Sequence, residues 1–420
     1  MLHNIKSINS PKYHFILFLL SPATAFYFGI KNYNSKYARK YIFLFSLFYS
    51  MSYIPIPYSD ATRYEKRIQE IPEYTFSSYV NEIKNMYNSD ALYNDAYVHT
   101  VFFILLPFTR NIIIFRLVFA LVYFSVYLAL IREIKFSNIL STNKHFNWFI
   151  LGIIFLISFS SGISGVRWPL ALMVFLLGYF KYISKPKIRY LFLVSSSLLI
   201  HFIAGYIVFF FFIFILTQRF YNPINSLILL IITFAFNLVI ISSVKSSAAN
   251  FGEGVESKTS AYIGNENYKE KREDHLKSLN WYVRFNRYST NYFVLFALVM
   301  SIYFLRRTNK SNFVLKLEYF AILMFIASFI SAQLVDSLSN RFYQSANGCG
   351  LIYLYCLYEE NKDSKFLNRL QMIYKPIILI HMAVILRGDL YTVSPNVVLG
   401  NVFTEMFYSF DTSIQEIIGI

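Results

Sequence analysis

The stretch WFILGIIFLISFSSGISGVRWPLALMVFLLGYFKYI, residues 148–183, decides the fold of this 420-residue chain. It contains two apolar runs, Trp148–Ser164 and Trp168–Ile183, separated by Gly165-Val166-Arg167. Each run is close to the length that a helix needs to cross a hydrocarbon core of about 30 Å. An arginine at the centre of such a helix costs roughly 2.5 to 3.5 kcal/mol on insertion scales, so it is kept where it meets an anion, water or a polar partner. Arg167 is therefore a candidate site residue.

The composition extends this pattern to the whole chain. Hydrophobic residues make up 56% of it and charged residues only 15%, whereas a soluble protein carries about 25% charge. We therefore expect an all-α, multi-pass membrane protein with one transmembrane domain, residues 1–420. About twelve spans are predicted, at Tyr13–Ile30, Tyr41–Pro57, Ile112–Ile131, Trp148–Ser164, Trp168–Ile183, Tyr190–Ile203, Gly205–Thr217, Ser226–Ser243, Tyr292–Leu305, Leu317–Val335, Phe342–Tyr358 and Pro376–Leu386. The shorter run Val98–Thr109 predicts a re-entrant or interfacial helix.

The basic residues orient these spans. The net charge is +16, and the lysines and arginines gather in short connectors at residues 31–40, 132–144, 181–189, 306–316 and 362–375. These connectors share one side if the spans alternate, and that side is cytoplasmic by the positive-inside rule. Membrane topology thus explains the charge, and we expect no nucleic-acid partner. Two polar loops, residues 58–95 and 245–290, then lie outside, together with Arg167, His201 and Arg341.

Several kinds of chemistry lose support. The chain has no GxxxxGK[ST] phosphate loop, no HExxH, no CxxC pair and no Asp-x-Asp pair. ATP hydrolysis, zinc catalysis and a metal-held nucleotide sugar are therefore disfavoured, and we expect neither a cofactor nor a metal. What remains is a set of arginines, a histidine, an aspartate and tyrosines at the outer boundary. Because the planar fork of arginine suits phosphate, they indicate a grip for a lipid-linked phosphate or pyrophosphate.

The order of the motifs resembles a known family. The motifs are Ser59-Asp60-Ala61-Thr62-Arg63-Tyr64 after the second span, Gly165-Val166-Arg167 with Ala171, the basic connector at residues 181–189, His201, and Asn340-Arg341-Phe342-Tyr343. Together they resemble the EpsG-type branch of bacterial polysaccharide polymerases, the Wzy-like proteins. The resemblance implies a GT-C-like fold and a multi-pass protein of the bacterial inner (plasma) membrane.

The resemblance also implies an activity. A growing glycan would move from undecaprenyl pyrophosphate onto a hydroxyl of a lipid-linked repeat unit at the outer face, making O-antigen or capsule without metal. The implied partners are undecaprenyl-pyrophosphate-linked oligosaccharide and membrane lipid, with a chain-length regulator and a flippase as further candidates.

Site roles follow from the motifs and the chemistry together. Arg167 and Arg341 are the predicted pyrophosphate contacts, with Tyr64, Trp168 and Tyr343 as further substrate contacts. Either His201 or Asp60 would act as the base or orient the acceptor.

Each role has a structural alternative. Arg167 could anchor its span at the interface, His201 could bond a neighbouring helix, and Asp60 could cap a helix running through Tyr64. His99 and His381 are expected to be packed or helix-bonded rather than catalytic.

Two other functions stay open. A flippase or carrier for lipid-linked oligosaccharide would suit about twelve spans, although transporters usually have pseudo-symmetric halves with a site at the midplane. An O-antigen ligase would use similar arginine and histidine chemistry.

Overall fold

The computed structural model describes residues 11–32, 36–57, 59–71, 73–86, 95–136, 146–235, 279–305, 310–331, 336–407 and 412–418. The predicted all-α class is confirmed over these residues, where the single β-bridge pairs Tyr53 with Val393. In chain order the helices are α1 (Pro11–Leu20), α2 (Pro22–Lys31), α3 (Lys36–Met51), α4 (Asp60–Glu70), α5 (Phe76–Asn85), α6 (Ala96–Leu105), α7 (Ile112–Phe136), α8 (Phe149–Ile154), α9 (Phe159–Ser164), α10 (Arg167–Ser184), α11 (Ile188–Ile200), α12 (Ala204–Thr217), α13 (Pro223–Ala235), α17 (Trp281–Phe304), α18 (Asn312–Ser331), α19 (Asp336–Glu360), α20 (Lys365–Leu390), α21 (Asn396–Leu399), α22 (Val402–Phe407) and α23 (Ile414–Ile418), with a 3₁₀ turn at Gln218–Phe220.

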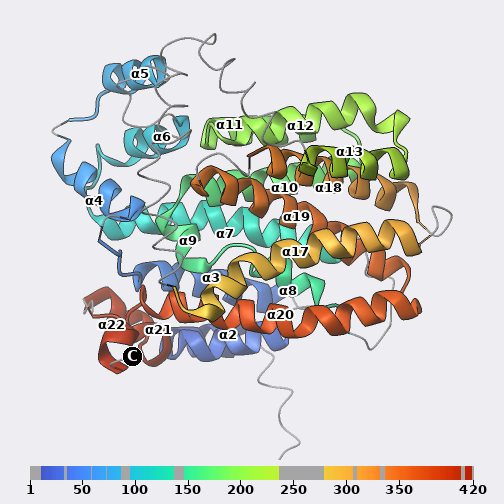
Figure 1. Cartoon of the computed structure of the whole chain (residues 1–420). Helices are drawn as coiled ribbons and strands as arrows, with labels where there is room; N and C mark the ends of the chain where they lie inside the picture. Colours follow the sequence, from blue (N-terminus) through green and yellow to red (C-terminus); the bar gives the residue numbers. More distant parts are fainter. Residues whose placement is uncertain are drawn as a thin grey trace, which may run out of the picture.

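The long helices α7, α10, α17, α19 and α20 run side by side, and the short helices α4, α5, α6, α9, α21 and α22 gather at one end of this bundle (Figure 1). Helix α10 is the centre. Its residues from Leu170 to Phe180 are all buried, because the sequence is apolar on every side and neighbours cover the whole circumference. At Gly178 a Cβ atom would lie 2.9 Å from the Val194 amide nitrogen of α11. This close approach holds α11 against α10.

Among the described residues, three helices are long and apolar enough to cross a membrane, at Ile112–Lys135, Asn312–Ser331 and Lys365–Leu390. Shorter apolar helices in the described part of the chain span Ala96–Leu105, Phe149–Ser164, Ile188–Ile200, Ala204–Phe220 and Pro223–Ala235. The chain thus has the helices of a membrane protein, and the count of about twelve spans stays a prediction.

Two expected spans are interrupted. The run Tyr13–Ile30 breaks at Ser21, whose backbone leaves the helical region directly before Pro22, since a residue preceding proline disfavours the α conformation. The run Trp148–Ser164 divides into α8 and α9, and Ser158 caps the second piece by accepting a hydrogen bond from the Ser161 amide. Continuous helices were therefore the wrong prediction for these two segments.

Elsewhere the boundaries differ in length. The predicted Pro376–Leu386 segment belongs to α20, which begins at Lys365 and continues through Pro376. The expected hairpin of Tyr190–Ile203 and Gly205–Thr217 is confirmed as α11 and α12, which reverse at residues 201–203. The predicted short helix at Val98–Thr109 is α6.

The two predicted outer loops also contain helices. Residues 58–95 include α4 and α5, and α17 begins inside residues 245–290, of which 245–278 lie outside the described residues.

A buried ion pair fastens the bundle where α17 ends and α18 begins. Lys310 contacts Glu318, which is fully buried. The Glu318 carboxylate also accepts hydrogen bonds from the hydroxyls of Tyr353 and Tyr221, both at 2.6 Å. The Lys310 ammonium donates to the Ser301 carbonyl at 3.1 Å. Together these contacts join α17, α18, α19 and the segment after α12.

Removing one partner of this pair should destabilise the fold. Glu318→Leu leaves the Lys310 charge buried without its carboxylate, which costs about 3 to 5 kcal/mol. We expect a clear loss of melting temperature in detergent. The double variant Glu318→Leu with Lys310→Met removes both charges and should recover most of that loss. A double variant no more stable than the single one would show that the pair is not what fastens these helices.

Candidate functional site

The candidate site lies where α4, the start of α6, the start of α10 and the turn between α11 and α12 meet. Helix α4 begins at Asp60 because the Ser59 hydroxyl accepts a hydrogen bond from the Thr62 amide at 3.3 Å. The predicted helix through Tyr64 is therefore confirmed, but its cap is Ser59 rather than Asp60. The side chain of Asp60 is left for other contacts.

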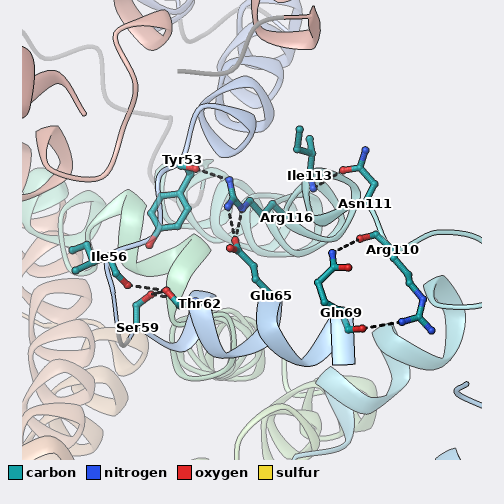
Figure 2. Close-up of polar contacts among 10 residues, drawn as sticks. All are labelled: Tyr53, Ile56, Ser59, Thr62, Glu65, Gln69, Arg110, Asn111, Ile113 and Arg116. Carbon is teal, nitrogen blue, oxygen red and sulfur yellow. Dashed lines mark hydrogen bonds and ion pairs between the residues drawn. The ribbon is translucent and has the colours of Figure 1, made fainter. Parts of the chain in front are cut away.

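Hydrogen bonds join helix α4 to the beginning of α7 (Figure 2). Arg116 donates to Glu65 at 2.8 Å and to the Tyr53 carbonyl at 2.6 Å. One turn further, Gln69 donates to the Arg110 carbonyl at 3.3 Å, and the Arg110 guanidinium donates to the Gln69 carbonyl at 3.1 Å. These contacts fix the helix that carries Asp60 and Tyr64.

Asp95 connects the elements of the site. It occupies the N-cap position of α6, but its side chain makes no capping hydrogen bond and is buried. It accepts a hydrogen bond from Arg167 Nη1 at 2.7 Å and another from the Phe202 amide at 2.9 Å. His201 Nδ1 lies 3.4 Å from the same carboxylate. One buried carboxylate thus holds the start of α10 and the α11–α12 turn.

Arg167 lies between two carboxylates and a ring. Besides Asp95, its guanidinium lies 3.7 Å from Asp60 Oδ2 and 5.9 Å from the centroid of the Tyr64 ring. The preceding residue, Val166, has a positive φ of 33°, which is strained for a β-branched side chain. The backbone is therefore turned sharply at the point where the arginine enters the site.

His201 is buried beside this pair. Its ring contacts the Trp168 ring edge to face, with centroids 5.9 Å apart. Burial lowers the pKa of the His201 imidazole below its ordinary value, and the charges of Arg341 and Arg167 lower it further against the attraction of Asp95. Burial alone would raise the pKa of Asp95, but His201, Arg167 and the Phe202 amide together hold it below its usual range. At neutral pH the site contains a neutral imidazole and an ionised carboxylate.

Trp168 links His201 to Arg341. Its indole nitrogen donates to Gln344 Oε1 at 2.8 Å, and the Arg341 guanidinium lies 5.8 Å from the centroid of its ring. Arg341 Nη1 is buried and has no hydrogen-bond partner among the described residues. Arg167 therefore already lies beside two carboxylates, whereas Arg341 Nη1 lacks a hydrogen-bond partner in the described part of the chain.

The structure brings together most of the predicted site residues but not all of them. Asp60, Tyr64, Arg167, Trp168, His201 and Arg341 form one connected set through the contacts above. Tyr343 lies apart, because two residues along a helix turn its side chain by about 200° relative to that of Arg341.

Sequence reasoning missed Asp95 and Gln344. Asp95 stands directly before the apolar run of α6, where an acidic residue is an ordinary helix-start signal. Its partners lie 72 and 107 residues away, and no local pattern reveals them. Gln344 follows Arg341 by nearly one helical turn, which placed it on the same face.

His99 and His381 are bonded within the fold, as predicted. His99 contacts the Tyr74 hydroxyl at 3.0 Å. His381 contacts the Asn286 side chain at 2.6 Å and the Phe155 carbonyl at 2.9 Å. No cluster of three or more His, Cys, Asp or Glu side chains suited to a metal occurs within the described ranges.

A family model matches residues 72–395 of the chain, and its description is the EpsG family. The matched region contains Asp95, Arg167, His201 and Arg341, and it begins after Asp60 and Tyr64. No curated protein and no solved structure matches the chain.

The lowered pKa of His201 predicts how stability depends on pH. Below about pH 6.5 the unfolded chain binds a proton on this residue that the folded protein does not bind. The stability that His201 contributes is therefore present above that pH and is lost as the pH falls. Between pH 7.5 and 5.5 we expect the melting temperature of the wild type to fall more than that of His201→Gln. Parallel curves for the two proteins would contradict a buried neutral imidazole.

Proposed function

Because this chain belongs to the EpsG family, we propose that it is a membrane glycosyltransferase that polymerises a surface polysaccharide, such as O-antigen or capsule. In this proposal about twelve helices of a GT-C-like fold cross the bacterial plasma membrane, and the site faces outward. The observation that carries the proposal is the unbroken series Arg341, Trp168, His201, Asp95 and Arg167. It sets a donor for an anion beside a neutral base.

The proposed reaction needs no nucleotide. A hydroxyl oxygen of the lipid-linked repeat unit attacks the anomeric carbon of the growing glycan, which is linked to undecaprenyl pyrophosphate. The bond from that carbon to the phosphate oxygen breaks, and undecaprenyl pyrophosphate leaves with the electron pair. The hydroxyl proton passes to His201. Since the leaving group already carries its phosphates, positioned cations suffice to stabilise the developing charge.

His201 is the proposed base because of its contacts. Nδ1 lies 3.4 Å from Asp95 without a hydrogen bond to it in the described structure, and the nearby carboxylate favours the proton on that nitrogen. Nε2 is then the nitrogen that accepts the proton of the acceptor. The neutral state at pH 7, which follows from the lowered pKa, is the state a base requires.

Asp60 suits a different role. Its carboxylate lies 3.5 Å from Arg63 Nη1 and 3.7 Å from Arg167 Nη2. Two neighbouring guanidiniums thus already engage this carboxylate. We therefore assign Asp60 to orienting the acceptor, with Tyr64 holding Arg167 beside it.

Arg341 and Arg167, the two predicted pyrophosphate contacts, have different proposed roles. Arg341 Nη1, buried and without a hydrogen-bond partner in the described structure, is the proposed primary contact. Arg167 donates a hydrogen bond to Asp95 at 2.7 Å. In this proposal part of the Arg167 charge remains to attract the pyrophosphate, and the hydrogen bond fixes the carboxylate beside His201. Trp168 supports the site from between Arg341 and His201.

The proposed polymerase needs several partners. Its substrate is undecaprenyl-pyrophosphate-linked oligosaccharide, and its surroundings are membrane lipid. A flippase that delivers the repeat units and a chain-length regulator would act with the protein. A carrier function is less well supported, because the candidate groups gather where the short helices α4, α6 and α9 lie, at one end of the bundle (Figure 1).

Substitution of the base and the anion donor tests the proposal. In a strain lacking this protein, Arg341→Gln and His201→Gln should each fail to restore long chains. Loss of one such group lowers the rate by about 10²- to 10⁴-fold. Purified variants should show the same loss with lipid-linked repeat unit extracted from the deletion strain, and a chelator should not change the wild-type rate.

Arg132→Gln is the matched control, since the Arg132 side chain is 52% exposed and pairs only with the adjacent Glu133 in the described structure. Normal chain lengths with both site variants would refute the assignment. A deletion strain that carries bare lipopolysaccharide core and keeps lipid-linked polymer would instead identify a ligase.

A further inference from the structure

The short helix α9 leads directly into the site. It ends at Ser164, and only Gly165 and Val166 separate it from Arg167, the first residue of α10. The Gly165 amide donates to the Ser161 carbonyl at 2.9 Å, so the turn is bonded back onto α9. The φ of 33° at Val166 is a conformation that persists only where the surrounding structure holds it. The place of the Arg167 guanidinium therefore depends on where α9 lies.

Helix α20 holds the chain on both sides of the interruption between α8 and α9. His381 contacts the Phe155 carbonyl, where α8 has ended, at 2.9 Å. Asp389 accepts hydrogen bonds through Oδ1 from the Ser160 amide at 3.2 Å and from the Ser160 hydroxyl. His381 and Asp389 are eight residues apart, so they lie on one face of α20. One face of a long helix thus supports the segment that leads into the site.

The contact with Asp389 completes the first turn of α9. Amide groups in the first turn of a helix have no acceptor within that helix. Here the Ser158 hydroxyl accepts from the Ser161 amide, and the Asp389 carboxylate accepts from the Ser160 amide. Ser160 and Asp389 are both more than nine-tenths buried. Removing the carboxylate would therefore leave a buried amide without its acceptor, which costs free energy.

Packing holds the other sides of α9. A Cβ atom on Gly162 would lie 2.3 Å from the Tyr123 ring of α7, so α9 lies directly against that ring. The Phe159 ring contacts the Tyr49 ring of α3, with centroids 6.4 Å apart. These contacts limit the sideways position of α9. Because hydrogen bonds are directional, the Asp389 contact also restricts rotation of α9 about its own axis, and such a rotation would move the turn that precedes α10.

We propose that Asp389 is a positioning residue for Arg167. It holds the start of α9 so that the turn before α10 brings the guanidinium to Asp95, while its own contacts are with Ser160. This inference rests on the proposed function, in which Arg167 fixes the Asp95 carboxylate beside His201.

The positioning role requires an acceptor oxygen rather than a charge. Both groups of Ser160 donate to Oδ1, whereas Oδ2 of Asp389 has no hydrogen-bond partner among the residues that the structure describes. Asp389→Asn keeps a carbonyl oxygen for Ser160 and places its amino group where no such hydrogen bond is lost. It also removes a buried charge, so the melting temperature in detergent should stay equal or rise. The rate of polymerisation by the purified variant should stay within about threefold of the wild-type rate.

Asp389→Leu has nearly the same shape as Asp389→Asn but offers no acceptor to Ser160. Misplacing a catalytic group by about 1 Å lowers a rate by up to about 10²-fold. We therefore expect Asp389→Leu to lose about tenfold to 10²-fold in the rate of polymerisation. An equal loss in Asp389→Asn would show that the charge itself is needed and would overturn the positioning role. A wild-type rate in Asp389→Leu would overturn it as well.

Glu318→Leu is the matched control for stability. It removes a buried carboxylate that belongs to the ion pair with Lys310 rather than to the site. Assayed below the melting temperatures of all variants, it should keep the wild-type rate, whereas Asp389→Leu should not. A comparable loss of rate in Glu318→Leu would mean that general destabilisation explains the effect, and the positioning role would be wrong.

A binding measurement separates this inference from the proposed function. The purified proteins are titrated with sugar-free undecaprenyl pyrophosphate. Asp389→Leu should bind it within about fivefold of the wild type, because Arg341 is the proposed primary contact and Arg167 contributes as a weak ion pair would. Arg341→Gln should bind far more weakly.

Two failures are then distinguishable. A loss of binding in Asp389→Leu as large as that in Arg341→Gln would contradict the positioning role alone. Unchanged binding by Arg341→Gln, or a wild type that does not polymerise the lipid-linked repeat unit, would overturn the proposed function and this inference with it.

Discussion

The contact of Asp95 with Arg167 is the interaction on which the site depends. A buried carboxylate is costly unless charged and polar groups compensate it. Here Arg167, the Phe202 amide and His201 surround it. The cost of burying each charge is offset only while all three segments stay together, so the pair acts as a joint between α6, α10 and the α11–α12 turn. Burial, rather than this pair, is the main cause of the lowered pKa of His201.

The contact of Asp95 with Arg167 also makes the two arginines of the site unlike each other. Arg167 is held by Asp95 and lies near Asp60, whereas Arg341 lies over the Trp168 ring and its Nη1 has no hydrogen-bond partner among the residues that the structure describes. An anion that enters the site meets one committed and one available guanidinium. Trp168 lies between the two groups, with its ring in contact with His201 and near Arg341. Its indole nitrogen is bonded to Gln344, which fixes the ring between them.

Much of the fold follows from the sequence because apolar runs bounded by basic residues mark helices. The centre of the bundle, α10, and the hairpin of α11 and α12 were predicted in this way. The break between α8 and α9 was not, because the carbonyl freed at Phe155 is bonded by His381, which is 226 residues away. Arg167 stood out because a cation beside apolar runs is expensive. Asp95 did not stand out, since its role in the site depends on contacts with Arg167 and Phe202, which lie far along the chain. Tyr343 and Arg341 point to different sides because both lie in one helix, two residues apart. Residue spacing predicts this only once the helix boundaries are known.

A structure of the protein with undecaprenyl pyrophosphate bound would test the central claim most directly. We predict that the diphosphate lies within hydrogen-bond distance of Arg341, while Arg167 remains on Asp95 and the His201 ring keeps its place beside that carboxylate. A diphosphate bound away from Arg341, or one that displaces Arg167 from Asp95, would contradict this account.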